Sequence, residues 1–96
     1  MRNRVIQVIR LTLIEELEII KKKIDLRDWI LGELKRFESK YGISTTDFTE
    51  KWKLKKIPEP DDYKILEEFL EWDGLSESLD KVDRELEALE KHIKES

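Results

Sequence analysis

The sequence predicts an all-α protein, an antiparallel hairpin of two long helices with coiled-coil-like packing and a short helix at its elbow. Apolar residues recur at three- and four-residue steps over two long segments, residues 13–41 and 61–94. Charged residues form 44% of the chain and hydrophobic ones 39%, a balance typical of thin helices with one apolar seam. Turn-forming residues separate the two segments, so we expect the chain to reverse there. Its 96 residues make a single domain.

Residues 1–12 precede the first long helix as an arm or a strand. The stretch RVIQVIRL, residues 4–11, is dense in β-branched side chains, which favours a short N-terminal strand. Thr12, followed three residues later by Glu15, then forms a capping box for a helix that begins at Leu13. The same stretch also fits the first turns of that helix, so both alternatives stay open.

The segment 13–41 has helical periodicity throughout. A break is the alternative near Asp25, because Asp25 and Asp28 offer a second helix start. Gly42 fits the left-handed position that follows a helix C-terminus. The apolar stripe consists of Leu13, Leu17, Ile20, Ile24, Leu31, Leu34 and Tyr41, widened by Ile30 and Phe37.

The elbow is expected to hold a short helix over residues 44–53. Ser44 is its N-cap candidate, with Asp47 three residues on. Phe48 and Trp52 are four residues apart and so share one helical face. We expect Gly42 and Ser44 to shape the corner, and the two aromatic side chains to plug the open end of the hairpin. Two prolines in IPEPDD then force an extended path.

The second long helix, residues 61–94, is expected to start at an Asp61 cap. Its apolar residues follow a heptad-like rhythm, which predicts packing as in a coiled coil. Gly32 and Gly74 are expected at a similar level of the two helices, where they would allow close backbone approach beside Trp29 and Trp72. The apolar residues are Ile65, Phe69, Trp72, Leu75, Leu79, Val82, Leu86, Leu89 and Ile93.

Composition excludes several classes of protein. The chain has no cysteine, so disulfides and thiolate metal sites are excluded. No stretch approaches about 20 uncharged apolar residues, so no membrane span is expected. Arginines interrupt the apolar N-terminal run, which does not read as a signal peptide, and a cytoplasmic location is expected. Asn3 and Gln7 are the only side-chain amides, a scarcity similar to that of hyperthermophile proteins.

The sequence offers no chemistry that would make an enzyme. His92 is the only histidine and has no nucleophile placed beside it in the sequence. The Glu-x-x-His pattern of di-iron bundles and the glycine-rich phosphate loop are both missing. We therefore expect a non-enzymatic protein with no cofactor, no metal and no catalytic residue.

Nucleic acid binding is an alternative with two weak indications. The stretch KWKLKK, residues 51–56, surrounds Trp52 with lysines, and such a group binds a phosphate backbone and stacks a base. A strand over residues 4–11 followed by a helix is similar to ribbon-helix-helix repressors, whose paired strands enter the major groove. That alternative is a homodimeric DNA-binding or structural protein paired through its N-terminal strand. Ile6 and Val8 do not suit a polar reading face, and the first helix is too long for that fold.

Charge is divided unevenly along the chain. Residues 1–58 carry fourteen basic and nine acidic side chains, and residues 59–96 carry five basic and fourteen acidic, so the net charge of −4 divides into +5 and −9. Such opposite blocks pair with each other or attract different partners. The acidic last helix is the element that best fits a basic surface on a partner.

Residues 37–92 resemble a group of small helical antitoxin-like proteins of archaea and bacteria, partners of small toxins. The shared pattern is an aromatic residue, a charged corner ending in Tyr-Gly, a Ser- or Thr-capped short helix with two aromatics, and an acidic run with Trp. The Pro-rich KIPEP departs from the usual Gly/Asp-rich linker. The matching positions are Phe37, Lys40, Tyr41, Gly42, Ser44, Phe48, Trp52 and Trp72.

The resemblance implies a protein partner, such as a small basic toxin, and carries over no catalytic residue. We expect a protein–protein interaction module whose acidic C-terminal helix neutralises that partner, in a homo- or hetero-oligomer. The expected contact residues are Glu71, Trp72, Asp73 and Glu77.

Overall fold

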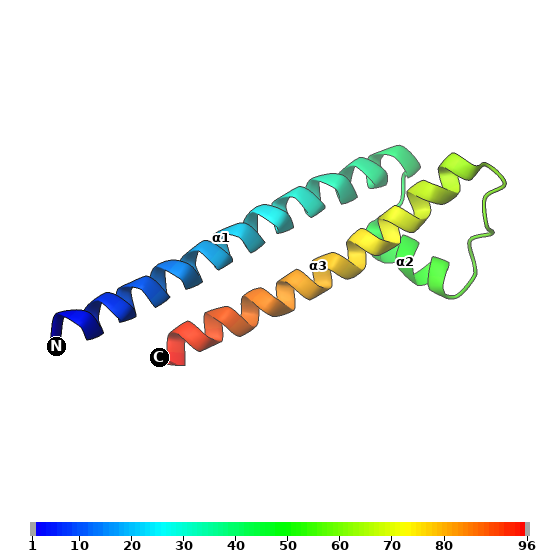
Figure 1. Ribbon diagram of the computed structural model, residues 1–96. Coiled ribbons are helices and arrows are strands. Elements are labelled where there is room, and N and C mark those ends of the chain that lie inside the picture. The colour runs from blue at the N-terminus through cyan, green and yellow to red at the C-terminus, as the bar shows by residue number, and fades with distance from the viewer. Residues whose placement is uncertain (1, 96) are drawn as a thin grey trace.

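The computed structural model describes the backbone of residues 2–95 and the side chains of residues 13–94. The described chain folds into α1 (Arg2–Tyr41), α2 (Thr45–Lys53) and α3 (Tyr63–Glu95). The long helices α1 and α3 lie side by side and antiparallel, and α2 packs beside them at the elbow (Figure 1). The molecule measures 67 × 21 × 18 Å. The predicted all-α antiparallel hairpin with a short helix at its elbow is confirmed.

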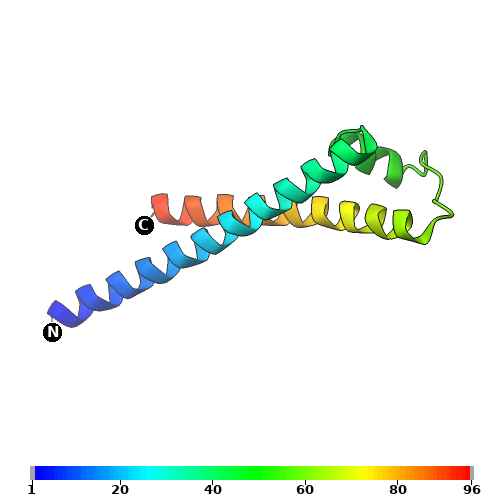
Figure 2. The same cartoon turned by 90° about the horizontal axis from the view of Figure 1, so that it is seen from above.

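The prediction of an N-terminal strand is wrong. Helix α1 begins at Arg2 and continues without interruption to Tyr41, so residues 4–11 are the first turns of this helix and no break occurs near Asp25. β-branched residues tolerate a helix well when a long helix is already nucleated beside them. The side chains of residues 2–12 lie outside the described part. The N-terminal turns extend past the C-terminal end of α3 (Figures 1 and 2).

Local capping chemistry shapes the elbow as expected. Gly42 has φ 68°, and its N–H donates to the Glu38 carbonyl at 2.8 Å, which ends α1. Ser44 Oγ accepts from the Asp47 N–H at 3.1 Å and caps α2. Helix α3 starts slightly later than predicted, because Asp62 rather than Asp61 accepts from the Lys64 N–H at 2.9 Å.

The C-terminus of α2 is closed by a Schellman motif. The Lys56 N–H donates to the Lys51 carbonyl at 2.8 Å, and the Lys55 N–H donates to the Trp52 carbonyl at 3.1 Å. Lys55 takes the left-handed conformation, with φ 55°, where glycine is usual. This turn directs the chain into the extended, proline-containing linker.

Buried side chains gather at one end of the hairpin. We call this end the elbow half: residues 30–41 of α1, the elbow with α2, and residues 63–82 of α3. Phe48 stacks on Trp72, with ring centroids 3.9 Å apart, and Phe37 stacks on the same indole. Trp52 is half-buried and stacks on Phe48, so both aromatic side chains pack into this end of the hairpin. The buried apolar residues are Ile30, Leu34, Phe37, Phe48, Trp72 and Val82.

The other end is the open half: residues 13–29 of α1 and 83–94 of α3. Here the helices meet through polar pairs. Lys23 pairs with Glu85, the Arg27 Nε–H donates to Asp83 at 2.6 Å, and His92 Nε2 lies 3.4 Å from the Glu16 carboxylate.

The apolar stripe of α1 is rotated out of this seam, contrary to expectation. Leu13, Leu17 and Ile24 are exposed, although they belong to the stripe that was expected to face α3. Residues 16, 23, 30 and 37 follow one seven-residue row of the seam, and the first two of them are charged. Fully buried apolar contacts between the helices therefore lie in the elbow half, whereas Ile20, Leu86 and Ile93 of the open half are only partly buried.

The two helical glycines do not mark a close approach. A Cβ atom added at Gly32 or Gly74 would find open space, with nothing within 4 Å. Trp29, expected to pack alongside, is 56% exposed. Both glycines thus lie on the outer surface, and the expected backbone contact is wrong.

Candidate protein-interaction surfaces

Trp72, one of the expected partner contacts, belongs to the core instead. Its side chain is 0% exposed, and its indole N–H donates to Thr45 Oγ1 at 3.0 Å. Thr45 is held in turn because its own N–H donates to a Glu38 carboxylate oxygen at 2.7 Å. Trp72 therefore joins α1, α2 and α3, and a partner cannot reach it in this fold.

The acidic part of α3 presents its charge on the surface. Between Lys64 and Lys81 the helix carries six acidic residues and no basic one. Glu71 and Glu77 are exposed, and neither makes an ion pair with any residue that the structure describes. Asp73 is half-buried, and its Oδ1 has no hydrogen-bond partner among the described atoms. Of the four expected contact residues, Glu71 and Glu77 are thus exposed, whereas Asp73 Oδ1 is buried.

Glu68 is the acidic residue of this segment that the fold itself uses. Lys40 Nζ donates to it at 2.6 Å, and the Tyr41 hydroxyl donates to its other carboxylate oxygen. The hydrogen bonds from Lys40 and then Tyr41 hold the pKa of Glu68 below its ordinary value. Burial, followed by the bond to Glu68, raises the pKa of Tyr41 to about 12. Glu68 is therefore part of the elbow's structure rather than of a free acidic surface.

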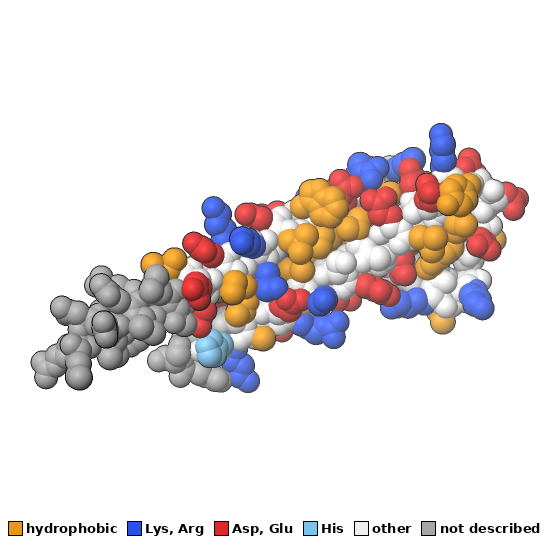
Figure 3. Space-filling view, in the orientation of Figure 1, with side chains coloured by type: hydrophobic (Ala, Val, Ile, Leu, Met, Phe, Trp, Pro, Cys, Tyr) orange, Lys and Arg blue, Asp and Glu red, His pale blue; other side chains and the backbone are white. Residues whose placement is uncertain are grey.

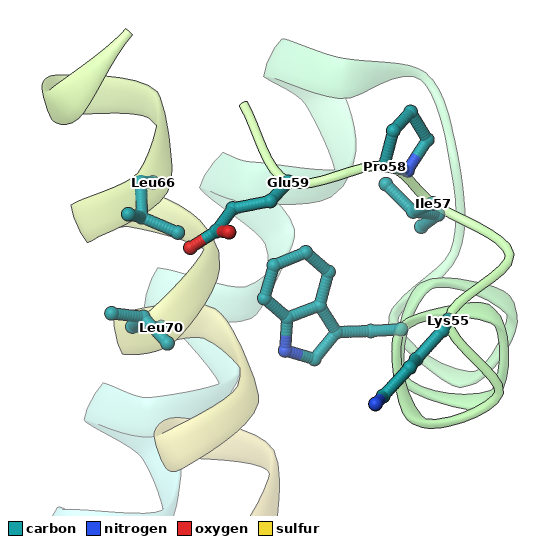
Figure 4. A pocket seen from close by; sticks show the side chains of 7 residues that line it. Lys55, Ile57, Pro58, Glu59, Leu66 and Leu70 are labelled. Carbon is teal, nitrogen blue, oxygen red and sulfur yellow. The ribbon is translucent and has the colours of Figure 1, made fainter. Parts of the chain in front are cut away.

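A shallow pocket lies at the elbow between the linker and α3. Leu66 and Leu70 of α3 form one side, and Ile57 and Pro58 of the linker form the other (Figure 4). Trp52 also lines the pocket, whose volume is about 520 Å³. Lys55 and Glu59 also line the pocket, and the Glu59 side chain points toward Leu66 (Figure 4).

The lysines around Trp52 do not form a stacking platform. The Trp52 ring already stacks on Phe48, with centroids 5.9 Å apart, and meets Phe69 edge-on at 5.6 Å. Phe48 thus occupies one face of the half-buried indole, and the pocket described above adjoins the same side chain. The arrangement favours a structural role for Trp52.

An apolar surface on α1 in the open half was missed by sequence reasoning. Large hydrophobic side chains lie exposed there, and hydrophobic groups interrupt the charged surface along the face seen in Figure 3. Leu13, Leu17 and Ile24 share one side of α1, and such a contiguous group marks an interaction surface. Ile19, Leu26 and Trp29 lie on the opposite side, where singly exposed apolar residues are ordinary. Glu16, Lys23 and Arg27 occupy the positions of α1 that face α3. These charged residues were the sequence signal that the apolar stripe faces elsewhere. The exposed residues are Leu13, Ile14, Leu17, Ile19, Ile24, Leu26 and Trp29.

The described residues contain neither a cluster of metal ligands nor a membrane-crossing helix. No three His, Cys, Asp or Glu side chains there lie together as metal ligands would. None of the described helices combines the length and apolar character that crossing a bilayer requires. His92 lies exposed on α3 opposite Glu16.

Comparison of the chain with protein-family models, with curated proteins and with solved structures gave no match. The resemblance to antitoxin-like proteins thus rests on the sequence pattern alone.

Proposed function

We propose that this chain is a non-enzymatic protein-interaction module, the neutralising subunit of a toxin–antitoxin-like pair. In this proposal the acidic outer surface of α3 covers a basic functional surface of its partner. Of the residues proposed for this contact, Glu71 and Glu77 are exposed, Asp73 is half-buried and Trp72 is buried.

The observation that carries the proposal is the unpaired charge on a rigid helix. Glu71 and Glu77 lie on the well-packed elbow half, where Trp72 and Phe48 hold α3 in place. A rigid helix loses little conformational entropy on binding, so its charges are effective in recognition. The acidic surface also steers a basic partner toward the elbow half.

The fold has its own ion pairs and does not need these carboxylates. Lys23, Arg27 and Lys40 of α1 pair with Glu85, Asp83 and Glu68 of α3. Glu71 and Glu77 make no ion pair with the described residues, although Arg36 interacts with the charge of Glu71 and Lys81 lies beside Glu77 in a shallow pocket.

A tagged pull-down from native lysate, followed by native mass spectrometry, tests the proposal. We expect a stoichiometric small basic protein in the eluate. The double variant Glu71→Gln with Glu77→Gln should weaken its binding by about tenfold or more, because exposed charges add together at a complementary surface.

The matched control replaces two exposed carboxylates outside α3, Glu15→Gln with Glu50→Gln, and changes the net charge equally. We expect binding within about twofold of the unmodified protein. Recovery of no partner, or equal weakening by both double variants, would contradict recognition through this acidic surface.

A further inference from the structure

Helix α2 covers one side of the α1–α3 pair, but only in the elbow half. It is anchored by Glu38 of α1 and packs on Phe69 of α3 through Phe48 and Trp52. Glu38 lies on the same seven-residue row of α1 as Leu17, Ile24 and Leu31. Phe69 likewise shares a row of α3 with Asp83 and Glu90. The side that α2 covers therefore continues into the open half.

In the open half this side is an apolar groove. Ile20 and Ile24 of α1 line it together with Leu86 and Ile93 of α3, and it encloses about 430 Å³. Glu90 and Lys94 stand at its rim and pair with each other at 3.0 Å. Leu13 and Leu17 extend the groove along α1 and are exposed. A helix packed here would occupy the place that α2 takes in the elbow half.

We propose that a second copy of this chain fills the groove, with the two α1 helices antiparallel across a twofold axis. The result is a four-helix bundle in which two hairpins share one core in their open halves. The inference stands apart from the acidic surface of α3 and does not rest on the proposed partner.

The spacing of the stripe suits a copy of itself. Leu13, Leu17, Ile20 and Ile24 are separated by steps of four, three and four residues, which read the same in both directions. In an antiparallel pair, Leu13 then lies opposite Ile24 of the other copy, and Leu17 lies opposite Ile20. A twofold interface requires this self-complementarity, because every contact between two different residues occurs twice, once in each direction.

The charges around the stripe favour the same arrangement. Glu18 precedes its midpoint and Lys21 follows it, both on the flank of the stripe that faces away from α3. An antiparallel pair brings Glu18 of each copy close to Lys21 of the other. A parallel pair would bring like charges together, which is unfavourable.

Sedimentation velocity over protein concentrations of about 1 μM to 1 mM tests the proposal with a matched pair of variants. Leu17 and Leu70 are 58% and 56% exposed, but only Leu17 lies on the stripe. We expect the unmodified protein to dimerise and Leu17→Glu to raise the dissociation constant at least about tenfold. Leu70→Glu should leave it within about twofold. A monomer at every concentration, or equal effects of both variants, would overturn the proposal.

Helical content and thermal unfolding, measured on the dilute Leu17→Glu protein, show whether the single hairpin of this variant is folded. Since Leu17 is exposed in the single hairpin, the variant should remain folded with the spectrum of the dilute unmodified protein. Unfolding of the dilute variant would show that Leu17 acts within the hairpin, and would contradict its role at an interface between copies.

Cysteine crosslinking tests the antiparallel direction, since the chain has no cysteine of its own. A mixture of Leu13→Cys and Ile24→Cys proteins should form a disulfide-linked dimer under mild oxidation, and Leu13→Cys alone should not. Efficient crosslinking of Leu13→Cys with itself would show a parallel pair and overturn the arrangement.

A charge exchange gives an independent test of the same pairing. Glu18→Lys alone and Lys21→Glu alone should each weaken self-association by about tenfold, because each brings like charges together. Their mixture should restore association as a heterodimer in native mass spectrometry. If the mixture associates no better than the separate variants, Glu18 and Lys21 do not face each other across the interface, and the arrangement is overturned.

Discussion

In the elbow half of the hairpin, α1 and α3 meet through stacked aromatic rings, and α2 covers this contact. In the open half, the ion pairs Lys23–Glu85 and Arg27–Asp83 join the two helices, and no described element covers them. The elbow half buries Phe37, Phe48 and Trp72 completely. The open half leaves most large side chains of α1 in contact with solvent. The difference indicates that the elbow half folds on its own contacts, whereas the open half is built for an additional helix.

Partly exposed ion pairs hold the open half together weakly. Such pairs contribute only about 0–1 kcal/mol each to the free energy of unfolding. Burial of a large aromatic side chain contributes several times more. The polar pairs instead keep α1 and α3 in one alignment, while the apolar stripe stays turned toward the place of a second copy.

Two tryptophans provide the strongest test of this comparison. Trp72→Ala should lower the free energy of unfolding by about 3–5 kcal/mol, because it leaves a cavity and an unpaired Thr45 hydroxyl. Trp29→Ala removes an indole that is 56% exposed. This variant should change the free energy of unfolding by less than about 1 kcal/mol in dilute protein. Urea denaturation followed by circular dichroism measures both. Similar losses from the two variants would abolish the distinction between the halves.

Converting the open half toward an apolar seam should stabilise the single hairpin. The double variant Lys23→Leu with Glu85→Leu replaces a half-exposed ion pair at the seam with apolar side chains. We expect the free energy of unfolding to rise by about 1–2 kcal/mol, since apolar replacement of such pairs is often favourable. Thermal unfolding at low protein concentration measures it. A marked loss of stability would show that the Lys23–Glu85 ion pair stabilises the open half more than an apolar contact does.

The glycines offer one substitution in each long helix. Gly32→Ala and Gly74→Ala should each raise the free energy of unfolding by about 0.5–1 kcal/mol. A Cβ atom meets nothing within 4 Å at either position, so no contact opposes the gain in helix propensity. Chemical denaturation of the two single variants measures the effect. Destabilisation by either alanine would place another part of the structure against that position.

The Tyr41–Glu68 contact predicts a pH dependence confined to the elbow half. The folded pKa of Tyr41 is raised, so its contribution is fully present below its unfolded pKa and is lost as the pH rises toward about 12. In a Tyr63→Phe background, Tyr41 is the only phenol, and its absorbance should titrate near pH 12. Adding Tyr41→Phe should flatten the alkaline loss of stability. A Tyr41 midpoint at the ordinary value would contradict the buried contact.

On the acid side the sign is reversed for Glu68. Its folded pKa is lowered, so its contribution is present above the unfolded pKa and is lost as the pH falls through the folded one. Glu68→Gln should make unfolding less sensitive to acid than in the unmodified protein, as followed by circular dichroism. An unchanged acid transition would show that Lys40 and Tyr41 do not hold this carboxylate.

Sequence reasoning succeeded where the governing chemistry is local. The left-handed position of Gly42 and the cap at Ser44 depend on a few neighbouring residues, so their roles were visible in the sequence. The i, i+4 spacing of Phe48 and Trp52 identified the plug for the same reason. These features fixed the elbow before any long-range contact was known.

It failed where long-range packing decides between local alternatives. Periodicity located the stripe of Leu13, Leu17 and Ile24, but which side of α1 meets α3 is set by the aromatic contacts of the elbow, many turns away. The β-branched run at residues 4–11 has a context-dependent preference, and a continuing helix absorbed it. Trp72 was placed among partner contacts because acidic neighbours surround it in the sequence, whereas burial depends on Phe37 and Phe48.

The most direct test of the account is hydrogen exchange of backbone amides, measured by mass spectrometry at several protein concentrations. The account predicts that amides of residues 30–41 and 63–82 exchange slowly at every concentration, because the elbow half is complete in one chain. Amides of residues 13–29 and 83–94 should become more protected as concentration rises and a second copy binds. Equal protection of both halves, independent of concentration, would contradict the claim that the open half needs a second copy.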